Sequence, residues 1–206
     1  GGIDGIAAKD PAGSDFAQAE DAGGLIGKFN GPACGPAGGF DMEHQEIYKL
    51  LLKTFGKEKI LEYTVTGGKE ESEQRDPFIL VKTESLLEVC RFLRDDERTA
   101  FDMLHCISGV DWPDYLESVY HLYSMTHHHW GILKVRAPKI SPSVPSAASI
   151  WPAANWHERE AYDLMGIVYE GHPDLRRILL PEEWEGHPLR KDYVMPEHEH
   201  LRELGL

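Results

Sequence analysis

Apolar residues recur at helical spacing in three stretches of the chain. The first predicted helix follows Asp41, a residue type that caps helix N-termini, and ends at Gly56. A second helix begins at Thr83, and a third, shorter one covers about residues 156–165. The inward faces of the first two helices are formed by Ile47, Leu50, Leu51 and Phe55 and by Leu86, Leu87, Cys90 and Leu93.

Five further stretches combine β-branched or aromatic residues with alternation or with a short apolar run, and these predict strands. They cover residues 60–66, 77–82, 101–108, 118–125 and 131–138. The resulting order is helix, strand, strand, helix and three strands, which lacks the strict alternation of a doubly wound fold. We therefore predict an α+β fold, a two-layer domain in which helices cover a mixed β-sheet and a long irregular C-terminal extension follows.

Composition divides the chain into three parts. Residues 1–40 are rich in Gly and Ala, show no apolar period and predict a flexible tail. This tail has no arginine and five acidic residues, so a mitochondrial presequence is not its explanation. Residues 41–150 hold the predicted α+β domain, which a stretch rich in Pro and Ser closes. Residues 151–206 contain the short third helix and then a segment in which repeated prolines exclude one continuous helix.

Charge and cysteine content exclude several classes of protein. The formal net charge of -14 argues against a general binder of nucleic acid or anionic membranes. The three cysteines, Cys34, Cys90 and Cys106, form no CxxC pair, so neither a disulfide framework nor a Cys-based metal or iron-sulfur site is indicated. A reducing compartment is expected. The apolar runs are far shorter than the roughly 20 residues that a membrane span requires.

Histidines offer the only metal-site candidates. The run His127–His129 lies between two predicted strands, where adjacent histidines cannot converge rigidly on one metal, so we interpret it as a solvated hairpin tip. His172 and His187 each stand in a Gly-His-Pro turn and leave a metal-dependent hydrolase as an alternative. Motifs for nucleophilic catalysis and for dinucleotide or phosphate binding are absent from the sequence.

The third predicted helix carries a dense group of charges, namely Glu158, Arg159, Glu160 and Asp163. One interpretation is a solvated face with i,i+4 pairs. The other is that Glu158 or Asp163 pairs with an arginine of the following segment and fixes its path. The candidate arginines are Arg176, Arg177 and Arg190.

The segment after this helix has large apolar residues but no regular structure to bury them. These residues are Ile178, Leu179, Leu180 and Trp184. A single domain of this size has little need of such a segment, and apolar and Arg anchors between prolines suit a permanent interface. We therefore predict that the segment docks on another protein.

The stretch EREAYDLMGIVYEGHPDLRRILLPEEWEGHPLRKDY, residues 158–193, resembles the 30 kDa subunit of respiratory complex I, which is the C subunit of proton-pumping NADH:quinone oxidoreductase. The resemblance covers roughly residues 43–195 and is most specific over 156–193. The family pattern includes Met165. The residues that carry the resemblance and that are expected at the subunit interface are Glu158, Arg159, Glu160, Asp163, Leu164, His172, Pro173, Arg176, Arg177, Ile178, Leu179, Trp184, His187, Pro188, Arg190, Lys191, Asp192 and Tyr193.

The resemblance implies a scaffold protein of the peripheral arm, without a redox centre, whose extension lies along the quinone-site (D) subunit of complex I. FMN and the iron-sulfur clusters would belong to partner subunits, and no catalytic, cofactor or metal residue is expected in this chain. The protein would lie on the cytoplasmic side of the bacterial inner membrane, or on the matrix side in mitochondria. The alternative within the same superfamily is the equivalent subunit of a membrane-bound nickel-iron hydrogenase or of a ferredoxin- or plastoquinone-linked complex.

Overall fold

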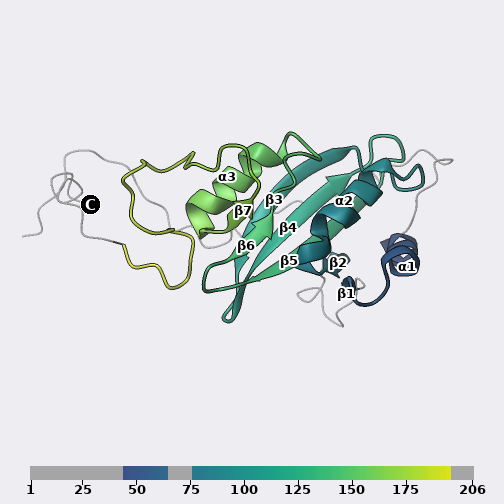
Figure 1. Ribbon diagram of the computed structural model, residues 1–206, viewed down its shortest axis with the longest axis horizontal. Coiled ribbons are helices and arrows are strands. Elements are labelled where there is room, and N and C mark those ends of the chain that lie inside the picture. The colour runs from purple at the N-terminus through teal and green to yellow at the C-terminus, as the bar shows by residue number, and fades with distance from the viewer. Residues whose placement is uncertain (1–43, 65–75, 196–206) are drawn as a thin grey trace, which may run out of the picture. The chain divides into compact units, whose positions relative to one another are not determined.

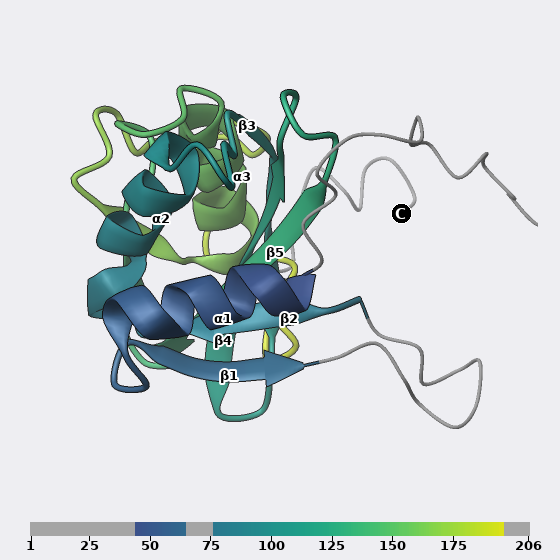
Figure 2. The same ribbon diagram turned by 90° about the vertical axis from the view of Figure 1, so that its right-hand side faces the viewer.

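A computed structural model describes residues 44–64 and 76–195 (Figures 1 and 2). The predicted tail and the Asp41 cap lie outside these ranges. The helices are α1 (His44–Phe55), α2 (Leu86–Asp95), which follows the 3-10 turn η2 (Thr83–Ser85), and α3 (Ala154–Met165). The strands are β1 (Ile60–Thr64), β2 (Phe78–Val81), β3 (Met103–Asp111), β4 (Tyr115–Tyr123), β5 (Trp130–Pro138), β6 (Ser143–Pro145) and β7 (Val168–Glu170).

Five strands form a mixed sheet in the order β1-β2-β5-β4-β3. The pairs β1/β2, β5/β4 and β4/β3 are antiparallel, whereas β2 and β5 run parallel. A parallel pair needs a long crossover between its strands, and here the crossover contains α2 and the β3–β4 hairpin. The predicted α+β architecture with a mixed sheet is confirmed.

One face of this sheet carries the hydrophobic core. Along β5 the side chains of Leu133, Val135 and Ala137 are buried, and they alternate with half-buried residues on the opposite face. The core joins this face to apolar residues of all three helices. Full burial of one such aliphatic side chain stabilises the fold by about 1.5–3 kcal/mol, so the core is the main reason why the helices stay on the sheet.

The second sheet was not predicted. It consists of β6 and β7, three residues each, which pair in parallel from Ser143 opposite Val168 to Pro145 opposite Glu170. Strands this short give no period-two signal. The proline in β6 also argued against a strand there, because proline cannot donate a backbone hydrogen bond. In sequence, α3 lies between the two strands of this small sheet, and the residues after β7 form no further helix or strand within the described ranges.

Two local predictions need correction. The prediction of a solvated tip is wrong for His129, which is 3% exposed and whose Nε2 lies 2.9 Å from the Thr99 carbonyl oxygen. The third helix begins at Ala154, two residues before the predicted start, and ends at Met165 because Gly166 adopts a left-handed φ of 74°.

Candidate functional site

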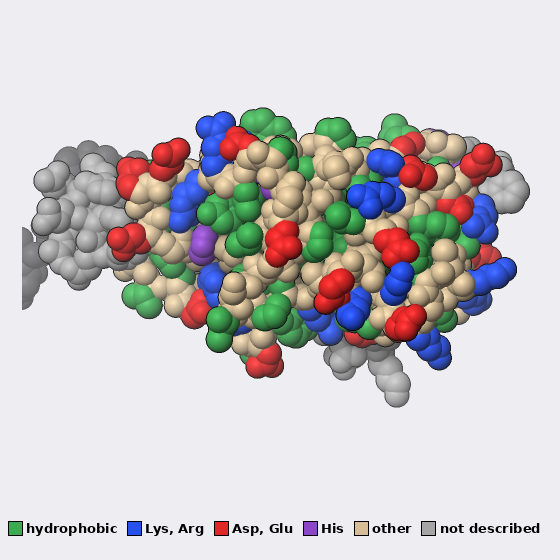
Figure 3. Space-filling model, viewed as in Figure 1, with side chains coloured by type: hydrophobic (Ala, Val, Ile, Leu, Met, Phe, Trp, Pro, Cys, Tyr) green, Lys and Arg blue, Asp and Glu red, His purple; other side chains and the backbone are tan. Residues whose placement is uncertain are grey.

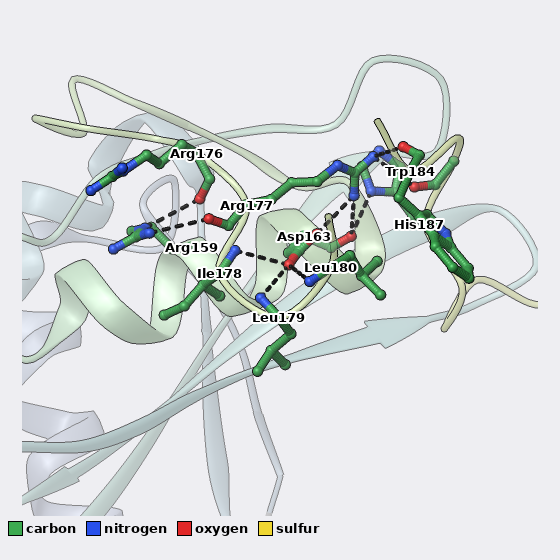
Figure 4. Close-up of polar contacts among 10 residues, drawn as sticks. Arg159, Asp163, Arg176, Arg177, Ile178, Leu179, Leu180, Trp184 and His187 are labelled. Atoms are coloured by element: carbon green, nitrogen blue, oxygen red, sulfur yellow. Dashed lines mark hydrogen bonds and ion pairs between the residues drawn. The ribbon is translucent and has the colours of Figure 1, made fainter. Parts of the chain in front are cut away.

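Residues 171–195, here called the C-terminal segment, contain no helix or strand. Backbone groups that lack a regular ladder still need hydrogen-bond partners. In this segment many of those partners are side chains of helix α3, as the close-up in Figure 4 shows.

Asp163 is the centre of this arrangement and is fully buried. Its Oδ1 accepts a hydrogen bond of 2.7 Å from Arg177 Nη1. Its Oδ2 accepts three backbone N–H groups, at 2.9 Å from Ile178, 2.7 Å from Leu179 and 2.9 Å from Leu180 (Figure 4). Successive N–H groups that point at one oxygen make an anion-binding nest, which here wraps around a side chain of the same chain.

These contacts decide the charge of Asp163. Burial alone would raise the pKa of this carboxyl. The backbone N–H groups and the Arg177 guanidinium together outweigh burial, so the pKa lies below its ordinary value. Asp163 is therefore ionised at neutral pH and forms a buried ion pair with Arg177.

Arg177 binds carbonyl oxygens at three separate places in the chain. Besides the carboxylate, its guanidinium donates to the carbonyl oxygens of Asp163 at 3.1 Å, Trp184 at 2.7 Å and Gly186 at 3.0 Å. Only arginine offers several donors in a fixed plane. The Arg177 side chain thus supplies hydrogen bonds that these carbonyl oxygens would receive from a neighbouring strand if the segment were part of a sheet.

Arg159 fixes the start of the same loop. Its Nε and Nη2 donate to the carbonyl oxygens of Arg176 and Arg177 at 3.2 and 3.1 Å. The guanidinium also lies 5.1 Å from the ring centroid of Trp156, one turn earlier on α3. Arg159 is only 8% exposed, so the start of the C-terminal segment binds to a buried arginine.

The two Gly-His-Pro histidines bind backbone groups. His172 Nε2 lies 3.1 Å from the Asn155 carbonyl oxygen, and its Nδ1 accepts the Asp174 N–H at 3.0 Å. Both ring nitrogens of His172 are thus in use. His187 Nδ1 lies 2.9 Å from the Asp163 carbonyl oxygen. Residues 44–64 and 76–195 contain no group of three or more potential metal ligands.

The end of the C-terminal segment is attached to the large sheet. Asp111, at the end of β3, accepts the Lys191 N–H at 2.8 Å and pairs with Lys139 at 2.8 Å. Arg190 donates to the Lys139 carbonyl oxygen at 3.1 Å. The segment is therefore fixed to the domain at both its beginning and its end.

The predicted ion pairs are partly confirmed. Arg177 pairs with Asp163 as expected. The other two candidate arginines contact carboxylates of the segment itself, since Arg176 pairs with Asp174 at 2.8 Å and Arg190 with Asp192 at 3.3 Å. A carboxylate two residues away is within reach of these side chains without the long path to α3.

The charged residues of α3 are partly buried and partly exposed. Glu158, Arg159 and Asp163 are buried, so the interpretation of a solvated face is wrong for them and holds only for the exposed Glu160. Among the residues that the structure describes, no arginine pairs with Glu158, which accepts hydrogen bonds from Ser146 and Ala147. Charge density along the sequence could not distinguish these cases, because the contacts that cover α3 come from residues 14 to 18 positions later.

The remaining predicted residues lie on α3 and on the C-terminal segment, where some large apolar side chains face solvent. Trp156, Leu179 and Leu189 are exposed by 61%, 61% and 59%. The half-buried predicted residues are Leu164, His172, Arg177, Ile178, Trp184, His187, Pro188, Arg190 and Tyr193. The exposed ones are Glu160, Pro173, Arg176, Leu179, Lys191 and Asp192. Large apolar side chains on a solvent-facing segment are typical of a protein-binding surface.

The open face of the large sheet contains a groove. It has a volume of about 680 Å³ and is lined by residues that include Phe78, Tyr115, Glu117, Lys134 and Arg136. Glu117 is buried and pairs with Lys134 at 2.9 Å and with Arg136 at 3.3 Å. The buried charge of Glu117 is therefore balanced by two cations of the neighbouring strand β5.

The surface shown in Figure 3 intersperses acidic, basic and hydrophobic side chains, without a broad patch of one charge. None of the helices within the described ranges has the length and apolar character that a membrane crossing needs.

Comparisons with known proteins agree on one family. The model of the family described as respiratory-chain NADH dehydrogenase, 30 Kd subunit, matches residues 79–199. The NADH-quinone oxidoreductase C subunit of Chloroherpeton thalassium is 50% identical over 159 residues, which cover 76% of this chain and 63% of that protein. Its counterpart from Saccharopolyspora erythraea is 44% identical over 170 residues, 80% of this chain and 66% of that protein. The chain thus spans slightly less than two thirds of these relatives.

A solved structure extends the likeness to another respiratory assembly. A chain of the membrane-bound sulfane sulfur reductase, an archaeal respiratory membrane complex, superposes with a TM-score of 0.58. It is 26% identical, and the match covers 73% of this chain and 85% of that one.

Proposed function

This chain belongs to the 30 kDa subunit family of respiratory-chain NADH dehydrogenase, and we propose that it is a non-catalytic scaffold in the peripheral arm of proton-translocating NADH:quinone oxidoreductase. The C-terminal segment is its docking surface, and the quinone-site subunit of the complex is the partner. The protein would meet the membrane only through the complex, on the cytoplasmic side in a bacterium or the matrix side in a mitochondrion.

The observation that carries this proposal is the anchoring of an irregular segment by buried side chains. The hydrogen bonds of Asp163 and Arg177 join these two side chains to each other and to six backbone groups of the same chain, so both side chains serve to hold the segment. The outcome of their contacts is a fixed surface that presents Leu179 and Leu189 to solvent. A pre-ordered surface binds a partner without a large further loss of conformational entropy.

The chemistry of the complex would lie elsewhere. The buried titratable groups of α3 contact backbone and hydroxyl groups, and Cys90 is buried in the core. We therefore assign no cofactor to this chain. FMN and iron-sulfur clusters are expected in partner subunits.

A second candidate is the equivalent subunit of a related membrane complex, such as a nickel-iron hydrogenase or a ferredoxin- or plastoquinone-linked enzyme. The likeness to a chain of the archaeal sulfane sulfur reductase complex favours keeping it. Proteins that co-purify with the chain distinguish the two candidates. Flavin subunits that bind NADH support the first, and a nickel subunit supports the second.

The docking surface can be tested with a matched pair of exposed leucines. Leu179 is 61% exposed on the C-terminal segment, and Leu61 is 53% exposed on β1. We expect Leu179→Glu to lower the amount of assembled complex on a native gel several-fold and to reduce recovery of the quinone-site subunit by mass spectrometry. Leu61→Glu should assemble like the wild type. Both isolated proteins should unfold at the wild-type temperature, because neither side chain is buried there.

Activity separates docking from chemistry. NADH:quinone turnover per assembled complex should stay near the wild-type value in the Leu179→Glu variant. Full assembly of this variant would overturn the docking surface. Full assembly together with lost turnover would place Leu179 in the quinone reaction instead.

A further inference from the structure

The open face of the large sheet, opposite the core, carries aromatic and cationic side chains that reach solvent. Side chains alternate between the two faces of a strand, so every second residue of β5 belongs to the open face. These residues are Trp130, Ile132, Lys134 and Arg136, and each is exposed or half-buried. The core residues that pack with the three described helices come from the other face of β5.

Three large side chains cross the open face in one row. Met103, Tyr123 and Trp130 are neighbours in register on β3, β4 and β5. Met103 is 40% exposed and Trp130 is 47% exposed. The rings of Tyr123 and Trp130 lie 4.6 Å apart between centroids, and the ring of His105 lies 5.1 Å from that of Trp130. Methionine and aromatic residues are enriched at protein interfaces, and here they are already packed together on a regular sheet.

The groove described above lies on the same face. Trp112, one of the residues that line it, is 37% exposed. The residue before it, Asp111, accepts the Lys191 N–H of the C-terminal segment. The open face therefore adjoins the place where the C-terminal segment is attached to the sheet.

Arg136 is held in this groove by two groups. Its Nε donates to Glu117 Oε2 at 3.3 Å, and its guanidinium carbon lies 4.8 Å from the ring centroid of Tyr115. The Glu117 side chain is only 2% exposed, and Lys134 donates to its other oxygen at 2.9 Å. A guanidinium that is positioned in this way loses little conformational entropy when it binds a ligand.

The two terminal nitrogens of Arg136 are not used in the same way. Within residues 44–64 and 76–195 neither makes a hydrogen bond, since Glu62 Oε2 lies 3.6 Å from Nη2 and both side chains are partly exposed, by 37% and 48%. Two terminal N–H groups of a guanidinium match the two oxygens of a carboxylate. The charges agree with such a ligand, because Lys134 and Arg136 bring two positive charges to the single buried carboxylate of Glu117.

The surroundings favour a carboxylate that belongs to a protein. Glu62 and Asp76 also line the groove, so the local field does not attract a free anion from solution. A protein that covers the exposed row of Met103 and Trp130 removes water from the neighbouring groove as well. A desolvated guanidinium is costly unless an anion pairs with it, so a partner that covers this face must supply a carboxylate.

We propose that the open face of the large sheet is a second docking surface, which receives a neighbouring protein of the assembly. Apolar residues of that protein cover Met103 and Trp130, and one of its Asp or Glu side chains binds the terminal nitrogens of Arg136. This inference rests on the proposed function only in that the chain works inside an assembly. It does not depend on which protein the C-terminal segment contacts.

The direct test is zero-length cross-linking of the assembled complex that contains Arg136→Lys. A carbodiimide joins an amine to a carboxylate that it touches, so peptide mass spectrometry should show residue 136 linked to an Asp or Glu of another subunit. The link must be absent from the wild type, because the reagent does not join a guanidinium. Links of residue 136 that stay within this chain, at Glu62, Glu117 or residues 1–43, would overturn the second docking surface, and so would the absence of any link.

The wild-type complex supplies a second measurement that needs no variant. Butanedione modifies accessible arginine side chains, and its reaction with Arg136 should be at least tenfold slower in the assembled complex than in the isolated chain. Equal rates would overturn the proposal. Both measurements concern whichever complex the chain forms, so they remain decisive if subunits that bind NADH fail to co-purify, a result that would refute the proposed function instead.

Discussion

Asp163 Oδ1 lies 2.7 Å from Arg177 Nη1, and through this ion pair helix α3 holds a segment that has no secondary structure of its own. The carboxylate is fully buried and the guanidinium side chain is 15% exposed. Together the two side chains satisfy six backbone groups of residues 163–186. Side chains thus perform the role that a ladder of backbone bonds performs in a strand.

Asp163→Asn should destabilise the protein strongly. The amide can face either the three N–H groups or the guanidinium, and its NH2 opposes donors in both orientations. Loss of one partner from a buried ion pair costs about 3–5 kcal/mol in the free energy of unfolding. Urea unfolding of the isolated wild-type and Asp163→Asn chains measures this loss of unfolding free energy.

Asp174→Asn is the matched control for this measurement. Asp174 and Arg176 also form an ion pair, but their side chains are 58% and 64% exposed. An exposed pair contributes about 0–1 kcal/mol. Equal effects of the two substitutions would contradict the central role of Asp163.

Arg177→Lys should preserve charge yet loosen the segment. A lysine ammonium can remain near Asp163, but it cannot reach the carbonyl oxygens of Trp184 and Gly186 in the same plane. Amide exchange should therefore rise by at least tenfold over residues 182–190 while helix α3 keeps its protection. Arg176→Lys is the control, and comparable loosening in both variants would argue against the bonds assigned to Arg177.

The architecture could be predicted because it depends on local patterns. Alternation along β5 and the apolar faces of α1 and α2 record which side of each element is buried, and the order of the elements excluded a doubly wound sheet. Strands β6 and β7 could not be predicted, since three residues carry too little pattern.

Contacts of the site could be predicted only where the two side chains are close in sequence or carry opposite charges. Asp163 and Arg177 are 14 residues apart, and each is the natural partner of the other. The bond from Lys191 to Asp111 spans 80 residues and involves a backbone N–H, which no side-chain pattern reveals. The burial of Glu158 escaped prediction for a similar reason, because it depends on the turn after β6 and on the packing of β4 and β7 around it.

Acid should remove the contribution of Asp163. A carboxyl whose pKa is lower in the folded chain adds stability above its unfolded pKa, about 3.9, and loses it as the pH falls through the folded value. The difference in unfolding free energy between wild type and Asp163→Asn should therefore be constant from about pH 5 to 8 and shrink below about pH 4. Glu158 is present in both proteins and cancels. A difference that persists at low pH would mean that packing, not charge, explains the effect.

The isolated chain should contain no stoichiometric iron, zinc or flavin. His172 uses both ring nitrogens on backbone groups, so a metal could bind it only by breaking one of those bonds. Elemental analysis and a visible spectrum test this, and added zinc should leave the unfolding temperature unchanged. Stoichiometric zinc that disappears in His172→Ala would instead support the metal-dependent hydrolase.

Two glycines with the same backbone conformation allow the contact with His187 to be measured separately from strain. Gly166 and Gly171 have φ values of 74° and 78°. A Cβ at Gly166 would lie 2.5 Å from His187 Cδ2, whereas one at Gly171 would meet nothing within 4 Å. Gly171→Ala should thus cost about 1–2 kcal/mol from the left-handed conformation alone. Gly166→Ala should cost about 1–3 kcal/mol more, because His187 must move and give up its bond to the Asp163 carbonyl.

Urea unfolding of both variants gives the difference, and amide exchange at 186–190 should rise only in Gly166→Ala. If the two variants lose the same stability, the packing of His187 on the end of α3 contributes nothing to holding the segment.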